Sequence, residues 1–447
     1  MKRTFLGKVA MAGMILSFSL CSNVVSATNI EREAAPGASG AATLMLPISS
    51  DNPKEQTSMK RYDKISGIPG LKEQIRKWHE DLHRIPETAL QEVNTSRYIA
   101  QALKGMGYEV HEGIGKTGIV AVLKVGNGKK SIGLRADFDA LPIQEVNDLP
   151  YKSERAGCAH LCGHDSHTAM LLGAAKYLME TKDFSGTLNL IFQPAEETME
   201  GGDAMIRDGL FERFPMDAVY GMHNGPSLPV GKFLFGKGNM MASVDNWEIV
   251  FTGKGGHGSA PENAIDPVVA GSSFVMALQT IVSRNVSPLD KCVVTVGAFN
   301  AGNAANVIPE SATLRLSIRN MKPETREMVL EKVRHIARTQ AESFGCKAEI
   351  HESHPGAVLT NNDECTDYVM DVAARTFGSE NVIVADHPSM GSEDFAFMLQ
   401  QKPGSYFFIG NGVDSKSLHH PEYVTNQEIL PMGANMWVAL VEDYLKE

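Results

Sequence analysis

Four short clusters of metal-binding side chains could carry out chemistry in this chain. They are Cys162-Gly163-His164-Asp165, Gln193-Pro194-Ala195-Glu196-Glu197, Met222-His223-Asn224 and Leu418-His419-His420-Pro421. Cysteine, histidine and glutamate are the side chains that bind zinc and related divalent ions. Each cluster lies beside turn-forming residues, so the pattern predicts a metal site assembled at the ends of several strands of one sheet.

The adjacent Glu196 and Glu197 need a neighbouring positive charge, because two carboxylates side by side repel each other. One carboxylate can bind a metal ion while the other holds a water molecule and accepts its proton. The ion lowers the pKa of that water from about 15.7 toward neutrality. The alternative is that both glutamates cap a helix or face solvent. The three other clusters favour the metal site.

Cys162 and His164 are two residues apart, so in an extended or turn segment both can reach one ion. The alternative is nucleophilic catalysis by a Cys162 thiolate with a histidine base. A cysteine hydrolase needs neither Glu197 nor a C-terminal histidine, so we favour the metal. Spacing does not separate His419 from His420 as the ligand of the fourth cluster.

Asp165 and His167 follow the first cluster directly. Either can be a hydrogen-bond partner of a ligand, and Asp165 can instead cap a helix that the pattern predicts from Thr168.

Strands that alternate with helices are predicted to position these clusters. Helices are expected over 71–83, 94–106 and 168–180, and strands over 117–124, 131–136, 187–192 and 218–222. This alternation predicts an α/β sheet, in which ligands bind beyond the carboxyl ends of the strands. Asp137, Asp139, Glu196 and His223 all follow a predicted strand.

The segment 243–354 has a different pattern, with the order β-α-β-β-α-β of a ferredoxin-like unit. It interrupts the first region, so we predict a catalytic domain in two parts, 67–242 and 355–447, with 243–354 inserted between them. Two loops of the insert contain polar residues, His257 in a glycine-rich loop and Asn306 in a second one. If the insert folds over the sheet, both can stabilise a developing oxyanion.

The N-terminus has the pattern of a secretory signal peptide over 1–27. Lys2 and Arg3 precede a short apolar run, and Val25-Ser26-Ala27 ends the segment. A retained anchor is the alternative, and a lipoprotein signal at Cys21 fits less well because Leu20 is bulky. Residues 28–66 are predicted to form a linker. We therefore expect an exported protein, periplasmic or secreted, with no membrane segment in the mature form.

Bulk composition excludes some classes of function. The formal net charge of -11 argues against a nucleic-acid partner held by phosphate contacts. The five cysteines that follow the predicted signal peptide are too few and odd in number for a disulfide framework.

The ordered set of motifs resembles the M20 metallopeptidase family, and within it the amidohydrolases that include hippurate hydrolases, aminoacylases and auxin-conjugate hydrolases. The resemblance runs from about residue 70 to the C-terminus. Besides the four clusters it rests on His83-Arg84-Ile85-Pro86-Glu87, Asp137-Phe138-Asp139-Ala140-Leu141-Pro142, Gly256-His257, Asn306-Val307-Ile308-Pro309 and Gly391-Ser392-Glu393-Asp394-Phe395. Leu161 and Ser166 stand where relatives often have smaller residues, which affects the shape of the pocket and removes no ligand.

The resemblance implies an exopeptidase-like catalytic domain with an inserted lid, through which two chains form a homodimer. It also implies two divalent ions in each subunit, manganese or zinc, with cobalt or nickel as alternatives. By the same resemblance Glu196 is the general base, His257 binds the oxyanion, often from the partner subunit, and Asn306 lies near the substrate. The implied ligands are Cys162, His164, Glu197, His223 and His419.

Taken together, these patterns predict a metal-dependent amidohydrolase that cleaves the amide of N-acyl amino acids or small peptides. The alternatives are a carboxypeptidase or dipeptidase, and a metal-binding or amino-acid-binding protein without turnover. Glu196 argues against the second alternative, because a binding protein has no use for a base there. The preferred acyl group, the stereochemistry and the native metal do not follow from the sequence.

Overall fold

The computed structural model describes residues 62–446. The predicted signal peptide, 1–27, and nearly all of the predicted linker lie outside the described residues. The linker prediction extends too far at its end, because Ile65 is fully buried and its N–H donates to the Asn435 side chain. Within the described range, no helix is long and apolar enough to cross a bilayer.

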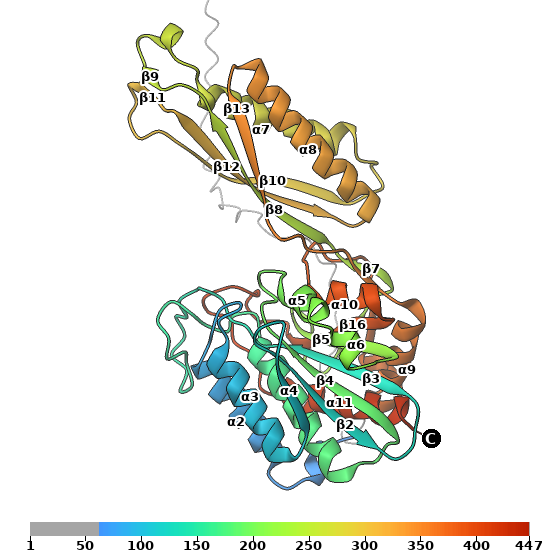
Figure 1. The fold of residues 1–447 in the computed structure, drawn as a ribbon. Coiled ribbons are helices and arrows are strands. Elements are labelled where there is room, and N and C mark those ends of the chain that lie inside the picture. Colours follow the sequence, from blue (N-terminus) through green and yellow to red (C-terminus); the bar gives the residue numbers. More distant parts are fainter. Residues whose placement is uncertain (1–61, 447) are drawn as a thin grey trace, which may run out of the picture. The chain divides into compact units, whose positions relative to one another are not determined.

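An eight-stranded mixed sheet forms the larger part of the fold (Figure 1). Its four central strands, in the order β4-β3-β5-β16, are parallel to one another, so their carboxyl ends meet at one edge. Strands β2 and β1 extend the sheet antiparallel beyond β4, while β6 and β15 extend it beyond β16. The strands are β1 (Glu109–Ile114), β2 (Gly118–Val125), β3 (Ser131–Asp137), β4 (Gly186–Gln193), β5 (Ala218–Pro226), β6 (Phe233–Phe235), β15 (Val382–Val384) and β16 (Gly404–Gly412).

Helices cover both faces of this sheet. One apolar core lies between the sheet and α2 (Leu71–Arg84), α3 (Val93–Met106), α4 (His164–Thr181), α9 (Asp363–Phe377) and α11 (Ile429–Tyr444). A smaller core on the other face includes residues of α5 (Gly201–Arg207), α6 (Leu210–Arg213) and α10 (Phe395–Gln401). Nearly every residue of α4 is buried, because it packs against α2, α11 and the sheet. The residues at its start are therefore held rigidly.

A second, four-stranded antiparallel sheet has its own core (Figure 1). Its chain order, β8-α7-β10-β12-α8-β13, is the predicted β-α-β-β-α-β order, and the helices α7 and α8 cover one face. We call these residues, Ser243–Glu352, the inserted unit. Its elements are β8 (Ser243–Thr252), α7 (Pro267–Arg284), β10 (Cys292–Ala301), β12 (Ser311–Asn320), α8 (Pro323–Ser343) and β13 (Lys347–Glu352).

Two small strand pairs complete the fold. Within the inserted unit, β9 (Gly256–His257) pairs with β11 (Val307–Ile308). Beside it, β7 (Gly238–Met241) pairs with β14 (Leu359–Asn361). The inserted unit therefore begins directly after β7 and ends shortly before β14. The exact domain limits, 243 and 354, stay predictions.

The predicted start of α4 at Thr168 is wrong, because the helix begins at His164. No side chain caps it: the N-cap is Gly163, in the left-handed region at φ 95°. A Cβ atom at this position would lie 2.4 Å from Oδ1 of Asn224, so only glycine fits the turn. Gly163 has no side chain that could act as a cap, so the pattern favoured the later start at Thr168.

Candidate metal centre

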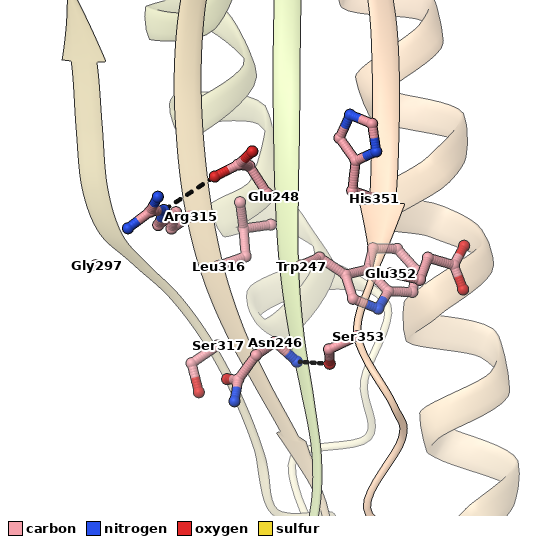
Figure 2. Close-up of a pocket in the computed structure, with 10 residues that line it drawn as sticks. All are labelled: Asn246, Trp247, Glu248, Gly297, Arg315, Leu316, Ser317, His351, Glu352 and Ser353. Carbon is pink, nitrogen blue, oxygen red and sulfur yellow. Dashed lines mark hydrogen bonds and ion pairs between the residues drawn. The ribbon is translucent and has the colours of Figure 1, made fainter. Parts of the chain in front are cut away.

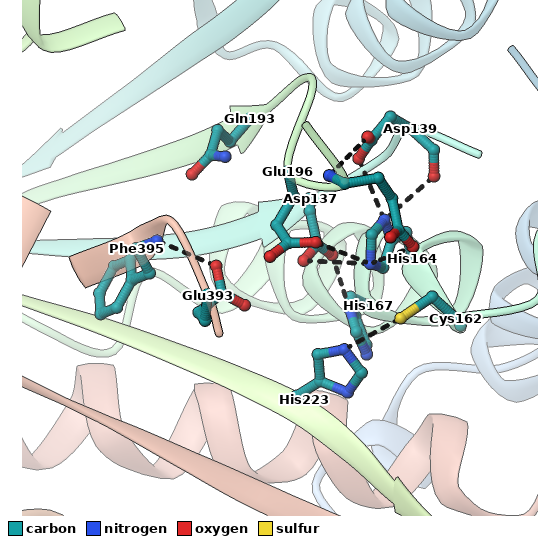
Figure 3. A network of polar contacts seen from close by, with 12 residues as sticks. Asp137, Asp139, Cys162, His164, His167, Gln193, Glu196, His223, Glu393 and Phe395 are labelled. Atoms are coloured by element: carbon teal, nitrogen blue, oxygen red, sulfur yellow. Dashed lines mark hydrogen bonds and ion pairs between the residues drawn. The ribbon is translucent and has the colours of Figure 1, made fainter. Parts of the chain in front are cut away.

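The donor residues gather at the carboxyl edge of the four parallel strands (Figure 3). Asp137 ends β3, Glu196 and Glu197 follow the end of β4, and His223 lies within β5. His164 reaches the same place from the first turn of α4, whose N-terminus faces this edge. Parallel pairing brings strand ends together that are far apart in the chain, as the sequence pattern predicted.

The five predicted ligand positions meet in two overlapping groups. One group is Cys162, His164 and His223, and the other is Cys162, Glu197 and His419, with the donor atoms of each group within 4.8 Å of one another. Cys162 Sγ lies 3.5 Å from His223 Nε2, and His419 Nε2 lies 3.3 Å from Glu197 Oε2. Cys162 belongs to both groups, so these five residues would hold two ions at neighbouring positions.

Two buried polar atoms in this cluster have no hydrogen-bond partner, Nε2 of His164 and Oε1 of Glu197. A buried polar atom without a partner costs about 1–3 kcal/mol, so folded proteins rarely leave one. A cation between these atoms removes that cost for both. The mixed nitrogen, sulfur and oxygen donors also suit a divalent transition metal. The residues present therefore fit the pair of ions that the family resemblance implies.

Hydrogen bonds orient the histidines for ligation. His164 Nδ1 lies 3.0 Å from the Asp139 carbonyl oxygen and 3.1 Å from its carboxylate, so Nδ1 is the protonated donor. His223 Nδ1 lies 2.7 Å from the Asn224 carbonyl oxygen. These contacts leave Nε2 of both rings deprotonated and directed at the cluster, as metal ligation needs.

His167 and Asp165 support the site from outside. His167 Nδ1 contacts Asp137 at 2.6 Å, and its Nε2 accepts the Asn224 N–H at 3.0 Å, so neither nitrogen is free to bind an ion. The helix-cap interpretation of Asp165 is wrong, because α4 begins before it. Its carboxylate instead contacts Nδ1 of His83 at 2.7 Å and touches no predicted ligand.

The turn that presents the two glutamates has a strained backbone. Ala195 has a φ of 53°, in the left-handed region that non-glycine residues avoid. Its N–H donates to the buried Glu92 carboxylate at 3.0 Å. Burial raises the pKa of Glu92 to about 7. The sequence analysis did not identify Glu92, which lies about 100 positions earlier in a loop without a motif.

The environments of Glu196 and Glu197 differ in a way that suits two roles. Burial and the neighbouring Glu393 and Glu197 carboxylates raise the pKa of Glu196 well above its usual range. The pKa of Glu197 is lowered despite burial, chiefly because His419 hydrogen-bonds to it. Glu197 is thus held ionised, as a ligand must be, while Glu196 holds a proton more readily.

A buried ion network lies behind Glu196 and was missed by the sequence analysis. Arg135 is fully buried and pairs with Asp137 at 2.8 Å, Glu393 at 2.7 Å and Asp394 at 3.1 Å. Although burial alone would lower it, these carboxylates raise the pKa of Arg135 well above its usual range. In the sequence, this network is marked by a single arginine among the mostly apolar residues of the predicted strand 131–136. Figure 3 shows the Glu393 carboxylate facing the side of the cluster that carries Glu196.

The donor cluster opens into a cavity of about 360 Å³. Apolar side chains, among them Met199, Val244 and Phe408, line one part of it, and Asn246 and Arg319 enter from the inserted unit. A larger hollow of about 490 Å³ lies on the open face of the second sheet, where Arg315 and His351 are among the residues that line it (Figure 2). That hollow contains none of the predicted ligands, so we place the active site in the smaller cavity.

The structure separates His419 from His420. His419 Nε2 faces Glu197, while His420 Nδ1 accepts the N–H of Glu422. His419 has a φ of 65°, and its N–H donates to the Leu161 carbonyl oxygen, which fixes the turn beside Cys162. The choice of His419 in the predicted ligand set therefore agrees with the geometry.

His257 and Asn306 do not line the cavity. They lie together, because Gly258 N–H donates to the Asn306 carbonyl oxygen at 2.8 Å. His257 follows the Thr252 end of β8, and Asn306 lies beside it. Val244, near the other end of β8, lines the cavity. Eight residues of strand span about 26 Å at about 3.3 Å each. Their catalytic roles stay predictions, and within one chain they require a large movement.

These observations define a class of protein, the hydrolases that use metal ions at the carboxyl edge of a mixed sheet. A family model, "Peptidase family M20/M25/M40", matches residues 133–443. The chain belongs to this family, and it is a hydrolase of amide or peptide bonds within it. The prediction from the sequence motifs is thereby confirmed.

Curated and solved relatives agree with this assignment. The chain is 47% identical to a hippurate hydrolase of Campylobacter jejuni, covering 86% of this chain and 99% of the relative. It is 37% identical to an N-acetyl-L-cysteine deacetylase of Bacillus subtilis, covering 83% and 88%. A crystal structure of a dinuclear metal-binding M20 peptidase from Bacillus subtilis superimposes with a TM-score of 0.71 at 32% identity, covering 85% and 99%. The predicted α/β fold class is confirmed by this similarity.

Proposed function

We propose that this hydrolase cleaves N-acyl amino acids into a carboxylic acid and a free amino acid, and that it recognises the substrate carboxylate through Arg319. The position of Arg319 carries this proposal, because it lies in the cavity that contains the metal donors. Relatives named for hippurate and for N-acetylcysteine, both N-acyl amino acids, support the substrate class.

Among the described residues that line the cavity, Arg319 is the only lysine or arginine. Its guanidinium donates to the Met390 carbonyl oxygen at 2.9 Å and to Ser392 Oγ at 3.3 Å, both neutral acceptors. Burial alone lowers the pKa of Arg319, with no carboxylate among the described residues acting against it. A partly buried cation without an anionic partner favours an anionic ligand, and arginine binds carboxylates with two parallel hydrogen bonds.

The chain's own residues can carry the proton transfers. The two ions, which we propose to be zinc or manganese, would be held by the five ligands named above; when bound, they polarise the amide carbonyl and lower the pKa of a water molecule. Glu196 accepts a proton as the water oxygen joins the acyl carbon. It then gives that proton to the departing nitrogen as the C–N bond breaks. The raised pKa of Glu196 favours this second step.

Changing Arg319 to methionine should weaken kcat/KM for N-benzoylglycine about 10- to 100-fold, because a hydrogen bond to a charged group contributes about 1.5–3 kcal/mol. The amide of the same substrate, which has no carboxylate, should be hydrolysed poorly by the wild type and no worse by the variant. A kinetic comparison of the two substrates, with metal content measured in parallel, tests this.

Arg315→Met is the matched control, because Arg315 lies four residues away on the same strand and pairs with Glu248 outside the cavity. Equal losses with both substrates in the Arg319 variant would contradict carboxylate recognition. Faster turnover of dipeptides than of N-acyl amino acids by the wild type would instead favour the peptidase alternative.

We also propose that two copies associate through the inserted unit. Strand β10 lies at the edge of the second sheet, and Val293 and Phe299 on it are exposed. On the neighbouring α7, Val269 and Met276 are exposed as well. An apolar sheet edge favours pairing, and pairing β10 with itself across a two-fold axis covers both elements at once. His257 lies far from the cavity of its own chain, so in such a dimer it can act on the cavity of the partner chain.

His257→Ala should lower turnover strongly without changing metal content, because it removes an oxyanion contact and no ligand. If the loop acts on the partner's site, mixing this variant with Glu196→Gln should restore part of the activity, since one site of each mixed dimer has both residues. Activity assays after verified subunit exchange measure this. An active monomer, or no recovery, would contradict action in trans.

Export remains a proposal supported by the pattern of residues 1–27. The mature protein should then begin at Thr28 and be found outside the cytoplasm. N-terminal sequencing of the native protein tests this, and a cytoplasmic product that retains Met1 would refute it.

A further inference from the structure

A second group of buried histidines and carboxylates lies beside the metal centre and has no part in the proposed reaction. His79 and His83 are four residues apart on α2, so they share one face of that helix. Asp165 from the first turn of α4 and His160 from the preceding loop meet them, and Glu145 lies on the far side of His83. All five side chains are buried, and none lines the active-site cavity.

Nitrogen atoms in this group lack partners in the same way as the donors of the metal centre. Among the described residues, nine buried side-chain nitrogen or oxygen atoms have no hydrogen-bond partner, and three are ring nitrogens of His79 and His160. Two others are the donors His164 Nε2 and Glu197 Oε1. His160 is the most unusual, because both of its ring nitrogens are unpartnered, and an imidazole always has a donor or an acceptor to satisfy.

Distances between three of the donors suit coordination by a tetrahedral ion, and the ring of His160 lies beside them, with its centroid 6.3 Å from that of His83. The donor atoms of His79, His83 and Asp165 all lie within 4.8 Å of one another. His79 Nε2 is 3.3 Å from Asp165 Oδ2, and ligands about 2.0–2.1 Å from a tetrahedral zinc ion are separated by about 3.3–3.4 Å. His83 Nδ1 lies closer to the same oxygen, at 2.7 Å, which is a hydrogen bond. For His83 to bind the ion, its hydrogen bond to Asp165 must therefore break.

The charges also favour a cation. Asp165 and Glu145 are both buried carboxylates, and buried charges need compensation. Protonation of His83, which contacts both, neutralises only one of them. A divalent ion bound to neutral histidines neutralises both, and it also satisfies Nε2 of His79 and one ring nitrogen of His160.

We propose that His79, His83, His160 and Asp165 bind a third divalent ion of the zinc class, separate from the pair at Cys162. Four protein donors close the coordination sphere, so the ion is structural and leaves no position for substrate. It joins α2 to the start of α4 and to the chain before Cys162.

Metal content after zinc loading and removal of excess metal measures this site. We expect three ions per subunit in the wild type and two in His79→Gln. The double variant Glu197→Gln/His223→Gln, which lacks two ligands of the catalytic pair, should keep one. His335→Gln, which removes an exposed histidine from the long helix α8, is the matched control and should keep three.

Thermal unfolding gives a second readout that does not depend on activity. Zinc should raise the unfolding temperature of the double variant, and adding His79→Gln or His160→Gln to it should abolish the rise. The proposal fails if the double variant holds no ion and shows no rise, because protonated histidines then suffice. It also fails if His79→Gln holds as many ions as the wild type. Neither result affects the proposed function, whose ions depend on other ligands.

Discussion

Replacing Glu196 by glutamine should lower kcat about 100-fold or more, the range of general acid–base catalysis, while the protein keeps its metal ions. Glutamine has nearly the same size and keeps a carbonyl oxygen, but it cannot accept a proton. The structure gives the physical reason: Glu196 faces the donor cluster, and its neighbour Glu197 has the environment of an ionised ligand. Steady-state kinetics with metal analysis of the same sample measures both quantities.

Glu197→Gln and Glu200→Gln complete this experiment. Glu197→Gln should lose metal, because it removes a charged ligand. The Glu200 side chain accepts a hydrogen bond from Thr198 at the surface, so Glu200→Gln should be tolerated. A Glu196→Gln variant that loses its ions, or one that retains normal turnover, would show that the two adjacent glutamates have the opposite roles.

Removal of the metal ions should abolish activity, by a factor on the order of 1,000 or more, because a Lewis acid supplies several kcal/mol and each 1.36 kcal/mol is tenfold in rate. The unpartnered atoms of His164 and Glu197 motivate this expectation. Dialysis against a chelator, followed by addition of zinc or manganese, measures the loss and the recovery.

The competing model, in which Cys162 is a nucleophile, predicts full activity without metal. The structure argues against it, because burial and the nearby Glu197 carboxylate raise the pKa of the Cys162 thiol well above its usual range. A catalytic thiol needs the opposite shift. Turnover by metal-free protein would nevertheless overturn the metal mechanism.

Parallel strands bring their carboxyl ends together, which is why Glu196, after β4, and His223, in β5, could be predicted to lie close to each other. The turn that the His419 N–H makes with the Leu161 carbonyl oxygen distinguishes His419 from His420 and could not be predicted from spacing. The sequence failed where tertiary packing decides the structure. The start of α4 depends on a glycine fitted against Asn224, and β1 is a mostly exposed edge strand without clear alternation.

Residues that act through distant contacts were also missed. Arg135 meets Glu393 across 258 positions of the chain, and Glu92 meets Ala195 across 103. Arg319 was not identified as a candidate site residue from the sequence. No local pattern distinguishes it from Arg315 on the same strand, and only the fold shows which of the two lies in the cavity with the metal donors.

The left-handed backbone at Ala195 and His419 has a consequence for laboratory evolution of this enzyme. Such conformations cost an L-residue about 1–2 kcal/mol each, and glycine avoids that cost. A screen that rewards heat resistance alone can therefore select glycine at either position. At His419 the exchange removes a ligand, and at Ala195 it loosens the turn that aims both glutamates. Thermostabilised libraries should hold these two codons constant, because stability and catalysis make opposite demands there.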